Sequence, residues 1–157
     1  PATGRVRCAA AGHPPPLVDE IVQAEGIQLK SIVILVPEEL RVLFDRGHLN
    51  QIFWNLVRNA WQHCQKKDGS IRIAARPGYV GDAIICELAD DGPGIAADLR
   101  GQIFEPFFTT RPGGTGLGLY IARELCDANG AALELLPRGP GAHFRMTMKR
   151  AFKPVVK

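Results

Sequence analysis

The chain lacks the features that mark several classes of protein. None of its apolar runs approaches the ~20 residues that cross a bilayer, and no basic, apolar and small-residue signal opens it. Its 19 basic and 16 acidic residues are mixed along 157 positions, so no polybasic block indicates contact with nucleic acid or a membrane. It has no internal repeats. We therefore expect one soluble, cytoplasmic domain with a single core.

The four cysteines, Cys8, Cys64, Cys86 and Cys126, are widely separated. Because they form no C-x-x-C pair, they disfavour both a zinc cluster and a redox motif. An even number permits a disulfide, but reduced thiols are the expectation for a cytosolic domain.

Apolar periodicity outlines one domain between two terminal segments. Residues 1–16 end in Gly-His-Pro-Pro-Pro, which cannot continue a helix, so we interpret them as a connector from a missing upstream domain. The domain itself extends over 17–150, and 151–157 form a C-terminal tail.

Within the domain, helical spacing of apolar residues predicts helices over 17–24, 48–66 and 119–128. Strand-like runs cover 31–36, 40–44, 70–76, 83–89, 131–136 and 143–149. Only Pro-Glu-Glu separates the first two runs, so we expect them to form a hairpin. This order predicts a two-layer α/β sandwich.

One predicted helix carries a polar stripe. Asn55, Asn59, His63 and Lys66 recur every three or four residues and therefore share one side of the helix. Asparagine is a mediocre helix former, so two on one stripe suggest amide oxygens kept for a ligand or for a hard cation such as magnesium. Solvent-exposed or capping asparagines are the alternative.

A long irregular segment, 90–118, contains seven glycines and three prolines, and such loops inside compact domains are usually functional. It begins with Asp90 at a strand end, where a carboxylate can accept a hydrogen bond from an exocyclic amine. A tight turn is the alternative there. Three phenylalanines follow within 104–108, a density that suits either a functional loop or an aromatic plug for the core.

The segment ends in Gly-Gly-Thr-Gly-Leu-Gly (113–118), which opens a helix. Free backbone amides and the helix dipole favour an anion there. No lysine followed by serine or threonine ends the loop, so it is not a P-loop, and its spacing is not that of a dinucleotide fingerprint.

Taken together, four segments occur in a characteristic order: QIFWNLVRNAWQH (51–63), DDGPGI (90–95), IFEPFFTT (103–110) and GTGLGL (114–119). They resemble the N, G1, F and G2 boxes of the histidine-kinase ATP-binding domain, in the superfamily shared with gyrase, ninety-kilodalton heat-shock chaperones and mismatch-repair ATPases. The resemblance spans about 17–149. It implies a Bergerat-type fold, with a mixed, mostly antiparallel sheet and helices on one face. The stretch GTGLGLYIARELC (114–126), together with the FEPFFTT box (104–110), looks most like kinases that work with nitrogen-control or pilus-gene response regulators.

The resemblance also implies a site for ATP and Mg²⁺. Asn59 would be the magnesium ligand, with Asn55 beside it in the phosphate region and His63 facing the nucleotide. Asp90 would bind the adenine amino group. Arg111 stands where the family often has a basic residue that reaches the terminal phosphate. The remaining implied binding residues shape the adenine pocket (Gly92, Gly94, Ile95) or belong to a mobile lid (Phe104, Thr109, Thr110, Gly114, Thr115, Gly116, Leu117, Gly118), which Phe104, Phe107 and Phe108 would anchor.

In the superfamily, members that hydrolyse ATP place a glutamate base one helical turn before the magnesium asparagine. This chain has Asn55 there, and an amide cannot accept a proton at neutral pH. The resemblance therefore implies transfer of the γ-phosphoryl group to a protein side chain, with Asn55 and Arg111 as catalytic residues. In the family the acceptor is a histidine followed by an acidic residue, a context that no histidine here has: His13 precedes three prolines and His48 precedes Leu49.

We therefore expect a histidine kinase catalytic domain that is inactive alone and acts on a dimerisation domain outside this chain, and through it on a response regulator. The isolated domain would be a monomer. The alternative is the nucleotide-binding module of a related serine kinase or chaperone-like ATPase. One departure concerns the turn after the last helix, where the family often has His-Gly-Gly and this chain has Ala128-Asn129-Gly130.

Overall fold

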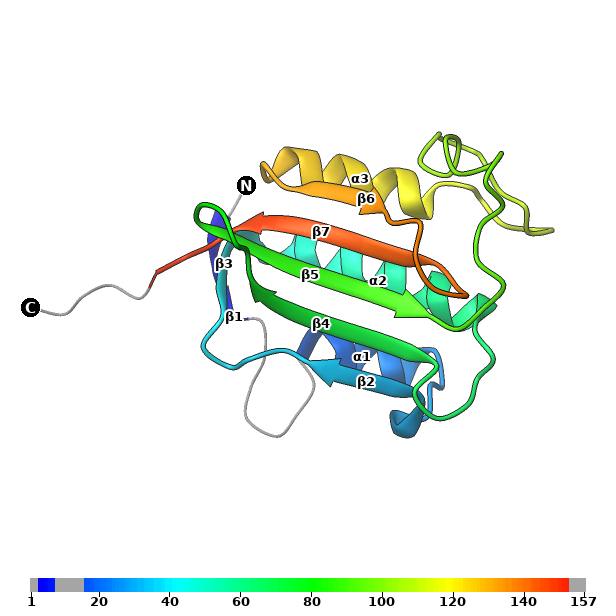
Figure 1. Cartoon of the computed structure of the whole chain (residues 1–157), viewed down its shortest axis with the longest axis horizontal. Coiled ribbons are helices and arrows are strands. Elements are labelled where there is room, and N and C mark those ends of the chain that lie inside the picture. Colours follow the sequence, from blue (N-terminus) through cyan, green and yellow to red (C-terminus); the bar gives the residue numbers. More distant parts are fainter. Residues whose placement is uncertain (1–2, 8–15, 153–157) are drawn as a thin grey trace, which may run out of the picture.

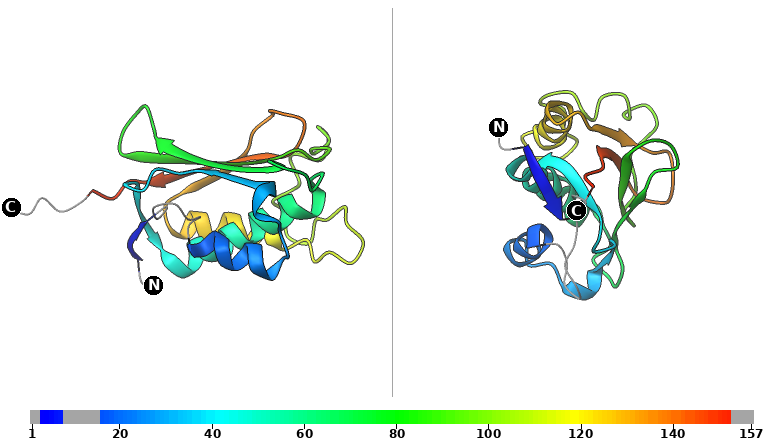
Figure 2. Two further views of the ribbon diagram at one scale, coloured as in Figure 1. Left: turned by 90° about the horizontal axis from the view of Figure 1, so that it is seen from below. Right: turned by 90° about the vertical axis from the view of Figure 1, so that its left-hand side faces the viewer.

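A five-stranded sheet forms one layer of the protein and helices form the other (Figures 1 and 2). The computed structural model describes residues 3–7 and 16–152. The strand order is β2-β4-β5-β7-β6, in which β2 and β4 are parallel and the other neighbours are antiparallel. These strands are β2 (Ile32–Leu35), β4 (Ile71–Pro77), β5 (Ala83–Asp90), β6 (Ala132–Leu135) and β7 (His143–Lys149). The predicted sandwich, with its mixed and mostly antiparallel sheet, is confirmed.

In the described part of the chain, three α-helices lie on the same face of this sheet, as Figure 2 shows edge-on. They are α1 (Pro16–Ala24), α2 (Arg46–His63) and α3 (Gly118–Ala128), close to the predicted ranges. A 3-10 turn, Leu29–Ser31, precedes β2.

The position of α2 is set at its start and along its buried face. Asp45 caps the helix, because its carboxylate accepts a hydrogen bond from the His48 backbone N–H at 2.9 Å. The buried residues of α2 are Leu49, Ile52, Leu56, Val57 and Ala60. With that face turned to the core, Asn55, Asn59 and His63 of the predicted stripe lie along a different side of the helix. The helix ends at His63, so Lys66, the predicted fourth member of the stripe, lies beyond it.

β5 alternates between the two faces of the sheet. Ile84, Cys86 and Leu88 are buried, while the residues between them are half-exposed. Asp90 ends the strand and belongs to the inward set, since side chains two apart share a face. Its carboxylate therefore lies on the helix side of the sheet, where it is buried.

The predicted hairpin between the first two strand-like runs is wrong. β2 pairs with β4 in parallel, and β3 (Arg41–Asp45) pairs with the antiparallel β1 (Thr3–Arg7), which lies in the segment interpreted as a connector. A short link does not decide the pairing, because burial of β2 against the central sheet outweighs local turn formation. β3 still reaches the main sheet through a bridge between Val42 and Arg150.

Asn129 explains the departure from the family at the end of α3. Its Oδ1 accepts the Asp45 backbone N–H at 2.8 Å, and its Nδ2 donates to the Leu125 carbonyl at 2.7 Å. The same Nδ2 lies 3.0 Å from Nδ1 of His48. A single asparagine thus ties the end of α3 to the start of α2, and Gly130 provides the positive φ of 66° that the turn needs.

Cys64 and Cys126 are free thiols, in agreement with the expectation for these two residues, and Cys8 lies outside the described residues. Among residues 3–7 and 16–152, no helix has the length and apolar character needed to cross a membrane.

Candidate functional site

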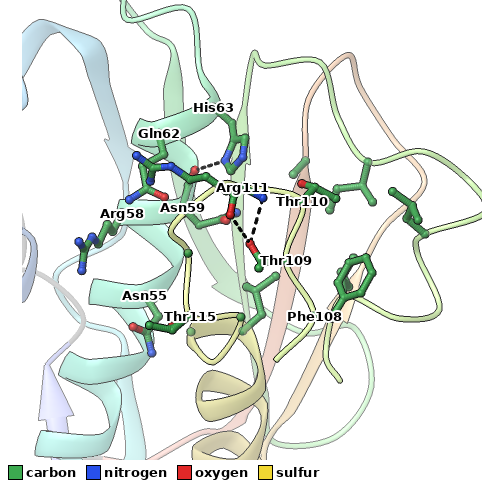
Figure 3. A pocket seen from close by; sticks show the side chains of 18 of the residues that line it. Asn55, Arg58, Asn59, Gln62, His63, Phe108, Thr109, Thr110, Arg111 and Thr115 are labelled. Carbon is green, nitrogen blue, oxygen red and sulfur yellow. Dashed lines mark hydrogen bonds between the residues drawn. The ribbon is translucent and has the colours of Figure 1, made fainter. Parts of the chain in front are cut away.

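A cavity of about 680 Å³ opens between α2, the end of β5, the irregular segment after it and the start of α3 (Figure 3). It brings together residues from all four of the segments singled out in the sequence. The predicted residues that line it are Asn55, Asn59, His63, Asp90, Gly94, Ile95, Thr109, Thr110, Arg111, Gly114, Thr115, Gly116 and Gly118.

The stripe on α2 supplies polar groups to one wall of this cavity. Asn55 Nδ2 is buried and has no hydrogen-bond partner within the described residues. A buried donor without a partner costs free energy, so a ligand acceptor that reached it would be favoured. One turn further, the Asn59 carbonyl lies 2.8 Å from Nδ1 of His63, which orients that ring (Figure 3).

Asp90 provides the buried carboxylate of the site. Its Oδ1 accepts the backbone N–H groups of Gly92 at 2.8 Å and of Ala142 at 3.4 Å. Among the described residues, no hydrogen bond falls on Oδ2, so this oxygen can accept one from a ligand. Burial raises the pKa of Asp90 above its ordinary value because it disfavours the charged form, and the two backbone hydrogen bonds only partly offset this.

The neighbouring Asp91 holds the wall in place. Its Oδ1 accepts the Gln65 backbone N–H at 2.9 Å and its Oδ2 accepts the Ser70 hydroxyl at 2.9 Å. Burial raises the pKa of Asp91, but these hydrogen bonds and the charge of Lys67 outweigh that effect and lower it overall. The segment that leaves α2 is thereby clamped to the end of β5, which keeps His63 opposite Asp90.

Two glycines allow backbones to approach closely around the cavity. A Cβ on Gly92 would collide with the His63 carbonyl oxygen, so this glycine does not line the cavity but lets β5 and α2 meet. A Cβ on Gly116 would collide with the backbone of Phe107. Gly116 also has a φ of 68°, a backbone conformation that residues with a side chain rarely adopt. The F and G2 segments therefore contact each other at a position where only glycine fits.

The three phenylalanines of the irregular segment have different roles. Phe104 packs edge-on against Phe144, with ring centroids 6.2 Å apart, and Arg123 lies 4.8 Å from its ring. It is partly buried, packs against the core and does not line the cavity, in agreement with the plug alternative. Phe108 both packs on the core and lines the cavity, whereas Phe107 is 75% exposed.

Between these aromatics and α3, the segment is held by short-range contacts. Thr109 Oγ1 accepts the Arg111 backbone N–H at 3.0 Å and lies 3.4 Å from the Arg111 carbonyl (Figure 3). Leu117, one of the implied lid residues, does not line the cavity. Instead it is the residue at the start of α3: its N–H donates to Thr115 Oγ1 at 3.3 Å, and its carbonyl accepts from Ile121.

Sequence reasoning missed several residues of the site. Gly141 packs against Asp90 so closely that a Cβ there would overlap the Asp90 backbone, and Ala142 donates to its carboxylate. The Gly-Pro-Gly stretch before β7 was the available signal, but such stretches are also ordinary turns. The other missed lining residues are Arg58, Gln62, Pro93, Ala96, Leu99, Ile103, Pro112, Gly113 and Leu119.

The charges of the cavity are unequal. Two arginines, Arg58 and Arg111, line it beside a single acid, Asp90. A ligand that combines an anionic group with a hydrogen-bond donor on an apolar ring system fits this arrangement, because the cations and the start of α3 favour the anion while Oδ2 of Asp90 accepts from the donor. The fold and the cavity together define a nucleotide-binding domain.

Comparison with known proteins identifies the family of this nucleotide-binding domain. Residues 44–151 match the family of histidine kinase-, DNA gyrase B- and HSP90-like ATPases, and the chain belongs to this family. The catalytic domain of histidine kinase ThkA has the same fold, with a TM-score of 0.71 at 32% identity over 85% of this chain and 92% of that domain. The chain is thus an ATP-binding catalytic domain of the histidine kinase type.

Within this family, the chain is similar to two sensor proteins of known type. Sensor protein kinase PilS of Pseudomonas aeruginosa is 40% identical over 114 residues, which cover 69% of this chain and 21% of PilS. Nitrogen regulation protein NtrY of Azorhizobium caulinodans is 34% identical over 122 residues, covering 73% of this chain and 16% of NtrY. The resemblance to pilus-gene and nitrogen-control kinases is confirmed. The chain spans about a fifth or less of the length of these curated relatives.

Proposed function

We propose that this domain binds ATP with Mg²⁺ and transfers the γ-phosphoryl group to a histidine on a dimerisation domain outside this chain, from which a response regulator receives it. The observation that supports this most is the cavity itself, in which a buried carboxylate on β5 and the asparagine stripe of α2 face one space. The sensor kinases among its relatives support the same role.

Asp90 would recognise adenine. Its free Oδ2 can accept the exocyclic amine, while Oδ1 stays engaged with the backbone of Gly92 and Ala142. Guanine has a carbonyl oxygen at the corresponding position, so its lone pairs would face those of the carboxylate. The geometry therefore favours ATP over GTP.

The opposite wall would hold the phosphates. Arg111, Arg58 and Gly118 at the start of α3 line the cavity, and the free backbone amides of a helix start favour an anion. The unpartnered Nδ2 of Asn55 is a further donor for a phosphate oxygen. Positioning and neutralisation of charge are most of what phosphoryl transfer requires.

The cavity also offers an oxygen ligand that suits Mg²⁺. Asn59 lines the cavity and carries an amide oxygen, which is a hard ligand, and magnesium in nucleotide sites takes few protein ligands because phosphates and waters complete its shell. When bound, the ion would neutralise charge on the β- and γ-phosphates. Asn59 would hold it next to Asn55, within one turn of α2.

Asn55 disfavours hydrolysis in comparison with transfer. Its amide cannot remove a proton from water, and among the described residues no side chain of the cavity other than Asp90 and His63 can act as a base. Asp90 is assigned to the adenine end. A histidine on another domain, brought to the mouth of the cavity, would meet the γ-phosphate in line.

Incubation with γ-labelled ATP tests this proposal. Alone, the chain should neither label itself nor hydrolyse ATP rapidly. Addition of a separate dimerisation domain with its acceptor histidine should give a phosphate that is labile in acid and stable in base, and the same domain with that histidine replaced by glutamine should stay unlabelled. Rapid hydrolysis by the chain alone, or label on its own serines, would contradict the proposal and favour a serine kinase or an ATPase.

A further inference from the structure

A salt bridge lies at the edge of the cavity, between Arg58 of α2 and Glu25 directly after α1. Arg58 Nε and Glu25 Oε1 are 3.6 Å apart. The Glu25 side chain is only 23% exposed, so solvent screens its charge incompletely. Its backbone N–H donates to the Ile21 carbonyl at 2.9 Å, which fixes Glu25 to the last turn of α1.

Arg58 both lines the cavity and forms an ion pair outside it. It precedes Asn59 and lines the cavity, yet in Figure 3 its side chain is turned away from Thr109 and Arg111, towards the opposite side of α2. The partner on that side is Glu25.

The Glu25 carboxylate and a phosphate group in the cavity would compete for the Arg58 guanidinium. A guanidinium is always charged and binds carboxylate and phosphate oxygens through the same fork of donors. A phosphate group in the cavity and the Glu25 carboxylate therefore offer Arg58 equivalent partners on opposite sides of one helix. The side chain is 57% exposed and flexible enough to exchange between them.

We propose that Glu25 is a positioning residue that withholds Arg58 from the nucleotide phosphates, so that Arg58 must leave this carboxylate to contact bound ATP. This inference rests on the proposed function. It links nucleotide affinity to the position of α1, because α1 packs against α2 and its side chains Val18 and Ile21 are buried.

The test is a comparison of nucleotide affinities by titration calorimetry. Glu25→Gln keeps the shape of the side chain and removes its charge. Because an ion pair whose arginine is exposed contributes a small free energy, Glu25→Gln should bind ATP about two- to fivefold more tightly than the parent chain. Adenosine, which has no phosphate, should bind both proteins equally.

Two controls separate Arg58 from a general change in charge. Glu20→Gln removes an exposed acid of α1, the helix that Glu25 follows, and should leave ATP affinity unchanged. In an Arg58→Gln background, Glu25→Gln should have no further effect. Melting temperatures of all variants would show that each remains folded.

The inference is overturned if Glu25→Gln binds ATP equally or more weakly, or if its gain persists without Arg58. A parent chain that does not bind ATP would overturn the proposed function as well. A parent chain that binds ATP with no response to Glu25→Gln would overturn this inference alone.

Discussion

Replacement of Asp90 by asparagine isolates the adenine contact from the fold. The substituted side chain would keep an oxygen for the Gly92 N–H at the position of Oδ1, but an amide NH₂ would replace Oδ2 and would face the adenine amine donor to donor. A hydrogen bond to a charged group contributes ~1.5–3 kcal/mol. ATP affinity should therefore fall roughly tenfold to a hundredfold.

Asp90→Asn should not lower the stability of the folded domain. A carboxyl whose pKa is raised by folding destabilises the folded state above its ordinary pKa, and this contribution disappears only as the pH falls below that value. At neutral pH, Asp90→Asn removes this cost, so its melting temperature should equal or exceed that of the parent chain. Loss of binding would then not be a consequence of unfolding.

The pH dependence provides a second readout. Because the ionised form accepts the adenine amine, ATP affinity of the parent chain should fall as the pH is lowered through the raised pKa of Asp90. The variant should lose this part of the pH dependence. Titration calorimetry with ATP and GTP measures both effects. Equal affinity of the parent chain for the two nucleotides, or undiminished ATP binding by the variant, would refute the assignment of Asp90 to adenine.

Three further predictions concern the metal, the lid and the core. Asn59→Ala should remove most of the gain in ATP affinity that Mg²⁺ provides while changing metal-free binding less, and titrations with and without EDTA would show this; a full magnesium effect in the variant would place the ligand elsewhere. Gly116→Ala puts a Cβ into the Phe107 backbone at a positive φ, so it should cost at least about 1–2 kcal/mol locally and weaken ATP binding about tenfold. Gly101→Ala, which has open space, should be neutral, and equal effects of the two changes would contradict the packing described. Burial raises the pKa of Cys126 to about 12, so at pH 8 its thiol should react with alkylating reagents far more slowly than the thiol of half-buried Cys64. Mass spectrometry of the modified peptides measures the two rates. Equal rates would show that α3 opens readily.

Much of the site could be predicted because its signals are local. The stripe on α2, the acid at the end of β5 and the glycine-rich start of α3 each show in a few neighbouring residues, and all three line the cavity. The same holds for the helices and most strands, whose periodicity reflects one buried face.

What failed depended on contacts between distant segments. The pairing of β3 with β1 is decided by where apolar faces are buried, not by the short link between β2 and β3. Arg58 escaped notice because its place in the cavity depends on the segment that folds over α2, and Glu25 reaches it only when α1 packs against α2. Gly141 and Ala142 meet Asp90 across two strands that pair only in the folded sheet.

The central claim is that four separate segments form one ATP site, and hydrogen exchange with a non-hydrolysable ATP analogue tests it most directly because it locates the ligand. Bound analogue should slow exchange at 92–95 and across 105–118, where the lid becomes ordered around the phosphates. The β4–β5 loop, 78–82, lies at the other end of the sheet and should not change (Figure 1). Exchange that stays the same in both segments of the cavity, or slows only elsewhere, would contradict a shared ATP site.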